Sequence, residues 1–290
     1  MEILLLSLII VAQLSQNVLL SAYTKKYGGQ GTFAVTALIA LAALAVFFFA
    51  GGFSYTFAWR YVPYSVAFAL SYASANLFTF LALREGSLSL TCLVNSYSLL
   101  IPALYGMIFL HEAVGVLMLI GIALLLVSLF LINREKKEEE GEKKITPRWI
   151  LFVSLSFLGN GFCSTTQKMQ QEAFGGVGTT EFMLVALALA FVIFFLLSFF
   201  CERGEGRTAI RGGWYFAVLC GLANGACNFF VILLNPMMPA SVMYPLISAG
   251  GILVTTLVSV FVFGERLSRS QWIGMAIGVA SIVCLNLRLF

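Results

Sequence analysis

Long apolar stretches alternate with short polar breaks along all 290 residues of the chain. A helix needs about 20 residues to cross the hydrocarbon layer of a membrane, and in lipid a helix pairs its own backbone groups. The pattern therefore predicts an all-α polytopic membrane protein. Its ten predicted transmembrane helices lie near residues 3–23, 32–51, 62–83, 88–109, 114–133, 149–170, 180–200, 212–234, 239–262 and 271–288.

The most strongly charged segment runs from Arg134 to Arg148 and reads REKKEEEGEKKITPR. It separates two apolar halves of similar length. We predict that residues 1–133 and 149–290 are two five-helix repeats and that residues 134–148 are the linker between them. Six basic residues nearly balance its five acidic residues, so the linker is a poor candidate for binding anionic lipid.

The two halves resemble each other in sequence. GGQGT at 28–32 recurs as GGVGT at 175–179, and ANLFTFLAL at 75–83 aligns with CNFFVILLN at 227–235. Matches of glycine and polar residues in register support an internal repeat more strongly than matches of apolar residues. At a constant offset of 153, the matched positions are Glu112, Ile120, Gly121, Ala123, Ser128 and Asn133 with Glu265, Ile273, Gly274, Ala276, Ser281 and Asn286.

An odd number of helices in each half requires the second half to enter the membrane from the opposite side. Inverted repeats of this kind are typical of transporters, which bind their substrate near the membrane midplane between the repeats. Of the 17 Lys and Arg residues, 14 lie on the side of the linker and 3 on the opposite side or at the termini. This bias predicts a cytoplasmic linker and two termini outside.

The composition excludes a water-soluble fold. Hydrophobic residues make up 60% of the chain and the mean hydropathy is +0.97, which leaves too little polar surface to face water. The first residues lack the basic stretch and cleavage site of a signal peptide, so we expect them to form the first spanning helix. The six cysteines lie in or beside apolar stretches without a CxxC pair, which indicates buried thiols.

Polar residues are concentrated in the helices at 3–23, 62–83 and 88–109 and in their counterparts at 149–170, 212–234 and 239–262. They recur at helical spacing and so share faces, which must meet each other or water because an unpaired amide in hydrocarbon is costly. We predict that these faces line a central substrate cavity. The predicted substrate-binding residues are Gln13, Gln16, Asn17, Tyr72, Asn76, Asn95, Ser98, Asn160, Ser164, Gln167, Asn224, Asn228, Tyr244 and Ser248.

A simpler interpretation of these amides is that they only join helices through hydrogen bonds, which are worth about 0.6 kcal/mol each in membranes. For Asn76 and Asn228, which precede apolar residues in both repeats, this interpretation is favoured. The convergence of six polar faces favours a cavity for the set as a whole.

Charged residues are scarce within the predicted helices. Lys168 lies four residues before Glu172, so an ion pair or snorkelling explains it more simply than substrate binding. His111 is expected to be a turn residue. Glu112 and Glu265 lie at matching hairpins, where we expect each to anchor a helix N-terminus.

Two segments carry a family resemblance: FLHEAVGVLMLIGIALLLVSLFLIN at 109–133 and VFGERLSRSQWIGMAIGVASIVCLN at 262–286. Each has a tight turn with Glu before a last helix that contains glycine. The chain resembles the drug/metabolite transporter superfamily in its ten-helix form with two EamA-type repeats. The resemblance implies alternating access and transport of amino acids, nucleotide sugars, other metabolites or drugs.

One departure from the superfamily limits the mechanism. Its four-helix multidrug members exchange protons through a Glu in their first helix, whereas the first helix here has Gln13, Gln16 and Asn17 and no carboxylate at its middle. Neutral amides suit uncharged or zwitterionic solutes, and no basic cluster for nucleotide sugars is visible.

We therefore predict a secondary transporter, an exporter of small neutral or zwitterionic metabolites such as amino acids, in the plasma (inner) membrane. A multidrug or other metabolite transporter of the same fold is the alternative. An intramembrane lipid-modifying enzyme is disfavoured because no catalytic cluster occurs, and a structural subunit is disfavoured by the inverted repeat. The expected partners are a small-molecule substrate and the lipid bilayer, without cofactor or nucleic acid; a monomer and a homodimer both stay open.

Overall fold

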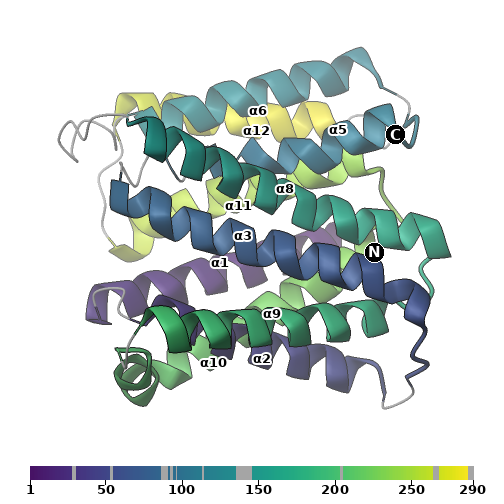
Figure 1. Ribbon diagram of the computed structural model, residues 1–290. Coiled ribbons are helices and arrows are strands. Elements are labelled where there is room, and N and C mark those ends of the chain that lie inside the picture. Colours follow the sequence, from purple (N-terminus) through teal and green to yellow (C-terminus); the bar gives the residue numbers. More distant parts are fainter. Residues whose placement is uncertain are drawn as a thin grey trace. The chain divides into compact units, whose positions relative to one another are not determined.

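A computed structural model describes residues 1–27, 31–52, 55–85, 91, 94–95, 97–112, 114–134, 146–202, 205–263 and 268–286. This part of the chain is helical and contains no strand (Figure 1). Its α-helices are α1 (Glu2–Tyr27), α2 (Thr32–Ala50), α3 (Val62–Glu85), α5 (Leu100–Ile108), α6 (Val116–Arg134), α8 (Pro147–Phe174), α9 (Thr179–Cys201), α10 (Glu205–Leu234), α11 (Ala240–Phe263) and α12 (Arg269–Asn286).

Each predicted span overlaps one of these α-helices, so the predicted all-α polytopic fold is confirmed. Among the described residues, six helices are long and apolar enough to cross a membrane, and four shorter helices are also apolar. The fourth span differs in detail from its prediction as one helix over 88–109. A 3-10 segment, Tyr97–Leu99, precedes α5, and Pro102 occupies the first turn of α5, where its missing N–H costs nothing.

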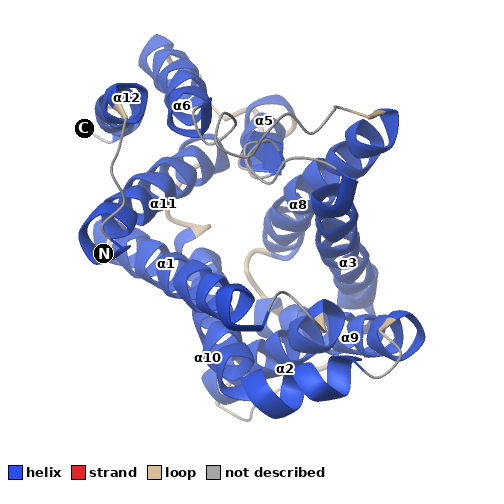
Figure 2. Ribbon diagram, turned by 90° about the vertical axis from the view of Figure 1, so that its left-hand side faces the viewer, coloured by secondary structure: helices blue, strands red, loops and turns tan. Residues whose placement is uncertain are grey.

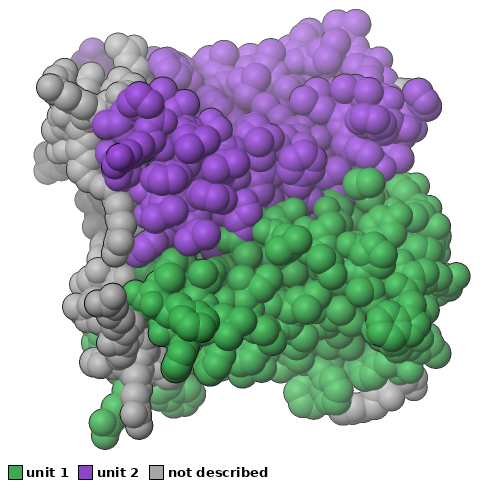
Figure 3. All heavy atoms as spheres, viewed as in Figure 1, with its two compact units in different colours: residues 1–73, 166–237 green, residues 74–165, 238–290 purple. Residues whose placement is uncertain are grey.

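The chain forms two compact units, shown in Figure 3. Unit 1 comprises residues 1–73 and 166–237, and unit 2 comprises residues 74–165 and 238–290. Each unit combines helices from both predicted repeats, and α3 and α8 each contribute to both units. The division into repeats at 1–133 and 149–290 stays a prediction, and residues 135–145 of the predicted linker lie outside the described residues.

Unit 1 is built around α10, which packs against both α1 and α2, while α2 also packs against α9 (Figure 2). Small residues permit this close packing. A Cβ added to Gly221 of α10 would lie 2.5 Å from the carbonyl oxygen of Ile39 in α2. Phe47 of α2 is fully buried and makes an edge-to-face contact with Phe229 of α10.

In unit 2, α6 and α12 form a helix pair with reciprocal contacts. The Ser128 hydroxyl donates to the Gly274 carbonyl at 2.7 Å, and the Ser281 hydroxyl donates to the Gly121 carbonyl at the same distance. Both Ser128/Ser281 and Gly121/Gly274 are pairs matched at the offset of 153, since 281 − 128 and 274 − 121 both equal 153. Residues that exchange roles in this way are what a two-fold axis between two helices produces.

Left-handed glycines precede the second helix of each predicted repeat. Gly31 (φ 65°) lies before α2 and Gly178 (φ 71°) lies before α9, at matching places in GGQGT and GGVGT. Residues with a Cβ rarely adopt this conformation, so the repeated glycine is required by the turn.

Two glutamates cap helices from a distance. The Glu112 carboxylate accepts from the N–H groups of Ala240 and Ser241 at 2.8 Å each, at the start of α11. This arrangement satisfies N–H groups that the helix leaves unpaired and places negative charge at the positive end of the helix dipole. The predicted anchoring role of Glu112 is confirmed, whereas Glu265 lies outside the described residues.

The second cap was not predicted. Glu202, just after α9, accepts from the N–H groups of Phe33 (2.6 Å) and Ala34 (3.1 Å) at the start of α2. Its position after a helix was the available sequence signal, but nothing in the sequence shows which N-terminus it meets.

Candidate substrate site

A ladder of amide side chains joins α1 to α10 in unit 1. Asn224 Nδ2 donates to Gln16 Oε1 at 3.3 Å, and Asn228 Nδ2 donates to the Asn224 carbonyl at 2.9 Å, with the Asn224 Oδ1 at 3.3 Å. We call Gln16, Asn224 and Asn228 the amide ladder. Its three members were all predicted as site residues, and the structure brings them together.

Some hydrogen-bonding groups in and beside the amide ladder are not used by the contacts above. Gln13 lies one turn before Gln16 on α1, and its Oε1 is buried without a hydrogen-bond partner. A carboxamide offers two donors and two acceptor lone pairs, so the contacts above use only part of the capacity of each side chain. This region of α1 and α10 can therefore accept further partners such as a polar solute.

The other predicted residues of unit 1 lie in different surroundings. Tyr72 stacks on Phe68 (centroids 6.1 Å apart) and makes an edge-to-face contact with Phe194. Gln167 is 2% exposed, and its Nε2 lies 3.9 Å from the sulfur of Met183. Asn17 is exposed on α1.

In unit 2, Asn95 belongs to a compact polar network with α3 and α8. Its Nδ2 donates to Thr79 Oγ1 at 3.0 Å, and its Oδ1 lies 2.9 Å from the Ser156 hydroxyl. Thr79 and Ser156 also hydrogen-bond each other, and Ser98 donates to the Asn95 carbonyl at 2.6 Å. The side-chain amide of Asn95 thus forms hydrogen bonds with the hydroxyls of Thr79 and Ser156, which are not among the predicted substrate-binding residues.

The remaining predicted residues of unit 2 are less closely connected. The Tyr244 hydroxyl donates to the Ser164 carbonyl at 3.1 Å, which ties α11 to α8. Tyr244 is 2% exposed, and Ser248, one turn further along α11, is also buried. Asn76 and Asn160 are half-buried on α3 and α8.

The pairing of Lys168 with Glu172 is confirmed. Lys168 Nζ lies 3.0 Å from Glu172 Oε1 and donates to the Asn235 carbonyl at 3.1 Å. Its side chain is 5% exposed, against 48% for Glu172. The charge is therefore buried in the protein and does not reach its surface by snorkelling.

These polar groups are neutral amides and hydroxyls, apart from Lys168 and Glu172. Within the described residues, no group of three His, Cys, Asp or Glu side chains could hold a metal ion. Neutral donors and acceptors of this kind make directed hydrogen bonds and carry no net charge.

Comparisons with known proteins identify the family. The model of the EamA-like transporter family matches residues 145–287. A probable subunit of a 4-amino-4-deoxy-L-arabinose-phosphoundecaprenol flippase, ArnE of Pseudomonas fluorescens, is 30% identical over 87 residues, which cover 74% of that protein and 29% of this chain.

Two longer alignments cover more of the chain. The probable glucose uptake protein GlcU of Priestia megaterium is 27% identical over 188 residues, and an uncharacterized protein of Haemophilus influenzae is 24% identical over 198 residues. These alignments cover 62% and 65% of this chain and 62% of each relative.

A solved crystal structure of a protein shows the same fold over the whole length. Its TM-score is 0.77 at 16% identity, and the match covers 98% of both chains. Together with the apolar helices, these matches show that the chain is a multi-pass membrane protein and that it belongs to the EamA-like transporter family.

Proposed function

We propose that this protein is a secondary transporter that exports small neutral or zwitterionic metabolites such as amino acids by alternating access around a central cavity. The observation that carries the proposal is the amide ladder of Gln16, Asn224 and Asn228 with the unpaired Gln13 Oε1 beside it. A transporter of cations or phosphates would be expected to use charged groups at such a place.

The proposed site residues are those predicted from the sequence, including Asn17 and Asn160. Amides bind solutes by directed hydrogen bonds while adding no net charge, so they do not require a charged cargo. In the proposed orientation the linker is cytoplasmic and both termini are outside, in the plasma (inner) membrane.

A sugar is the second candidate cargo. A relative aligned over 62% of this chain is named a probable glucose uptake protein. Amide and hydroxyl side chains also suit sugar hydroxyl groups, and a tyrosine such as Tyr72 offers an aromatic surface for the sugar ring.

The test is transport by the purified full-length chain in proteoliposomes loaded with labelled amino acids, glucose or drug-like amines. We expect amino acids to exchange across the membrane faster than in empty liposomes. Asn17→Ala and Asn160→Ala should lower the exchange of the identified solute by about tenfold, because each removes a hydrogen bond to it. If both variants transport like the wild type, these residues do not belong to the site.

A further inference from the structure

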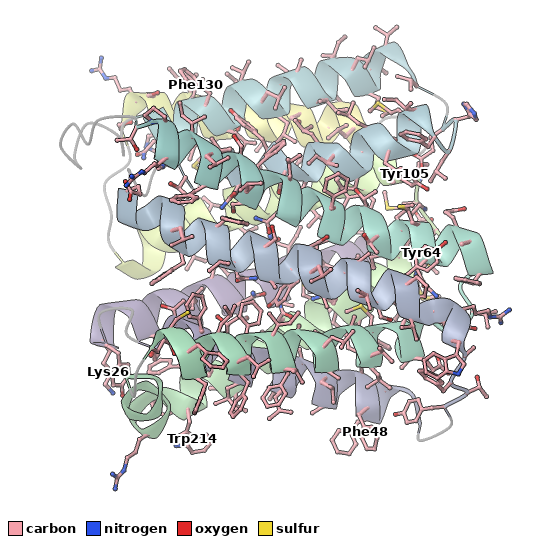
Figure 4. All side chains as sticks on the ribbon, viewed as in Figure 1. Lys26, Phe48, Tyr64, Tyr105, Phe130 and Trp214 are labelled. Atoms are coloured by element: carbon pink, nitrogen blue, oxygen red, sulfur yellow. The ribbon has the colours of Figure 1, made fainter. Side chains whose placement is uncertain are left out.

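Lys26, at the end of α1 (Figure 4), is exposed but held in place by aromatic rings. Its ammonium lies 5.4 Å from the ring centroid of Tyr27, 5.8 Å from that of Tyr215 and 5.9 Å from that of Phe216. It also donates to the Tyr215 hydroxyl at 3.1 Å. This hydrogen bond raises the pKa of Lys26 above its ordinary value, so the side chain carries its charge at neutral pH.

Two consecutive glycines of α10 allow the aromatic end of α1 to come close. The Tyr27 hydroxyl donates to the Gly212 carbonyl at 2.6 Å, and a Cβ added to Gly213 would lie 2.6 Å from Tyr23 Cε2. These contacts fix the end of α1 against the first turns of α10. Lys26, next to Tyr27 in the chain, is therefore placed beside α10 by the packing of its neighbours and not only by its own flexible side chain.

Arg211 supplies a second cation on the same face of α10. It is exposed and lies four residues before Tyr215, a spacing at which side chains are neighbours on a helix. Helical side chains lean toward the N-terminus, so the Tyr215 side chain that binds Lys26 is directed toward the turn that contains Arg211. Neither Lys26 nor Arg211 forms an ion pair with a side chain that the structure describes.

This end of unit 1 has the residue types of a membrane–water interface. Trp214 is 54% exposed (Figure 4), and Phe199 and Phe200, which end α9 just before α10 begins, are each 71% exposed. The apolar span of α10 begins at Arg211, and Lys26 lies beyond the apolar span of α1. Tryptophan and tyrosine gather at the level of the lipid headgroups, and long basic side chains reach the phosphates there.

A structural role accounts for only one of the two cations. The helix dipole favours Lys26 at the end of α1, but it gives no reason for Arg211 near the start of α10. The carboxylate of Glu202 does not neutralise them, because it accepts from the N–H groups of Phe33 and Ala34 at the start of α2. An ammonium and a guanidinium without a described counter-charge suit a phosphate oxyanion.

We propose that Lys26 and Arg211 bind the phosphate of an anionic phospholipid, with Trp214 at the level of its headgroup. The acyl chains would lie along the exposed aromatic side chains of α9. A headgroup with net negative charge is favoured over a zwitterionic one, because the ammonium of the latter is repelled by the two cations. This site goes beyond the proposed function, since its ligand is a lipid of the surrounding bilayer and not a transported solute.

Thermal unfolding of the purified full-length chain in neutral detergent tests the site, with phosphatidylglycerol, phosphatidylcholine or glycerol 3-phosphate added. Phosphatidylglycerol should bind about tenfold to thirtyfold more tightly than phosphatidylcholine, and salt should weaken its binding because exposed charges are screened. Glycerol 3-phosphate, which has a phosphate but no acyl chains, should not stabilise the protein. Equal binding of the two lipids would overturn the proposal, and stabilisation by glycerol 3-phosphate would replace the lipid site by a site for free phosphates.

Lys26→Met and Arg211→Met should each weaken the binding of phosphatidylglycerol by about fivefold and leave that of phosphatidylcholine unchanged. Both side chains are exposed, so the variants keep the fold. Lys26→Arg should retain most of the affinity, because it keeps the charge. Wild-type affinity of both methionine variants would overturn the site and leave the proposed transport function intact.

Arg60→Met is the matched control in the same unit. The Arg60 guanidinium also lies over aromatic rings, 5.2 Å from Tyr61 and 5.3 Å from Phe174, and donates to the Tyr61 hydroxyl at 3.1 Å. Tyr64, an uncharged residue, lies four positions later and at the opposite end of unit 1 from Lys26 (Figure 4). Arg60→Met should bind phosphatidylglycerol like the wild type. A loss as large as that of Lys26→Met would mean that any cation on aromatic rings suffices, which would overturn the site.

Discussion

The α6–α12 pair of unit 2 and the α1–α10 pair of unit 1 use polar side chains in opposite ways. Between α6 and α12, each of two serine hydroxyls donates to a glycine carbonyl of the facing helix at 2.7 Å. Between α1 and α10, Asn224 donates to Gln16, and Gln13 Oε1 has no partner. In the α6–α12 pair each of these two hydroxyls is used in a hydrogen bond to the facing helix, and we call α6–α12 the closed pair. In the α1–α10 pair an amide oxygen stays without a hydrogen-bond partner.

This difference follows from the residue types. A serine hydroxyl has a single proton and is satisfied by one carbonyl, and glycine lets the backbones come close enough for that bond. A carboxamide has two donors and two acceptor lone pairs, so a single amide-to-amide contact cannot satisfy it. We infer that the two hydroxyl–glycine contacts fix α6 to α12, whereas the Gln16–Asn224 contact leaves amide groups that can offer hydrogen bonds to a solute.

The largest effect is expected where the closed pair is forced apart. A Cβ at Gly274 would lie 2.9 Å from Ile132 Cγ1 and 3.1 Å from its backbone nitrogen. Gly274→Leu should therefore lower the free energy of unfolding by about 3 kcal/mol, the upper end for overpacking a tight core. Thermal unfolding in detergent measures this loss of stability. The control is Ala276→Leu, which adds the same side chain on the exposed face of α12. Equal stability of the two variants would mean that α6 and α12 are not in close contact.

A smaller change in stability but a clear change in transport is expected in the amide ladder. Asn224→Ala removes one hydrogen bond between helices, worth about 0.6 kcal/mol of stability. If Asn224 also binds the solute, transport should fall by about tenfold, because a hydrogen bond made to the substrate is lost. Exchange in proteoliposomes, normalised to the amount of folded protein, separates the two effects. A variant that transports normally would place Asn224 with the purely structural amides.

Much of the fold could be predicted because it depends on one physical requirement. Each helix must be long enough to cross the hydrocarbon and apolar enough to remain there, so the lengths of apolar stretches determine the helix bounds. The offset of 153 matched Ser128 with Ser281 and Gly121 with Gly274, and in the structure each serine donates to the glycine of the other pair. The sequence alone did not predict these contacts.

The partners of individual side chains could not be predicted in the same way. Asn95 was identified by its helical spacing, but Thr79 and Ser156 are isolated hydroxyls in apolar surroundings and follow no pattern. The capping role of Glu202 could not be predicted either, because the helix that it caps, α2, begins 170 positions earlier in the chain, with 202 − 32 = 170. A polar side chain in a membrane helix indicates that a hydrogen-bond partner exists, but only the packing of the helices decides which residue is that partner.

The smallest expected effect tests the symmetry of the closed pair most directly. Ser128→Ala and Ser281→Ala each remove one of two reciprocal hydrogen bonds, so each should cost about 0.6 kcal/mol of unfolding free energy. Because the two bonds are separate and formed by equivalent groups, the single variants should match each other and the double variant should show their sum. Thermal unfolding of all three variants provides the comparison.

Transport supplies the control for this last prediction. Both hydroxyls donate to backbone carbonyls within unit 2, and neither belongs to the predicted site, so exchange per folded molecule should stay at the wild-type rate. Unequal losses of stability would show that the two contacts differ in strength despite their matched geometry. A fall in transport at wild-type stability would mean that the α6–α12 pair moves during the transport cycle. The serine–glycine contacts would then do more than fix two helices, which would contradict their contrast with the amide contacts of α1 and α10.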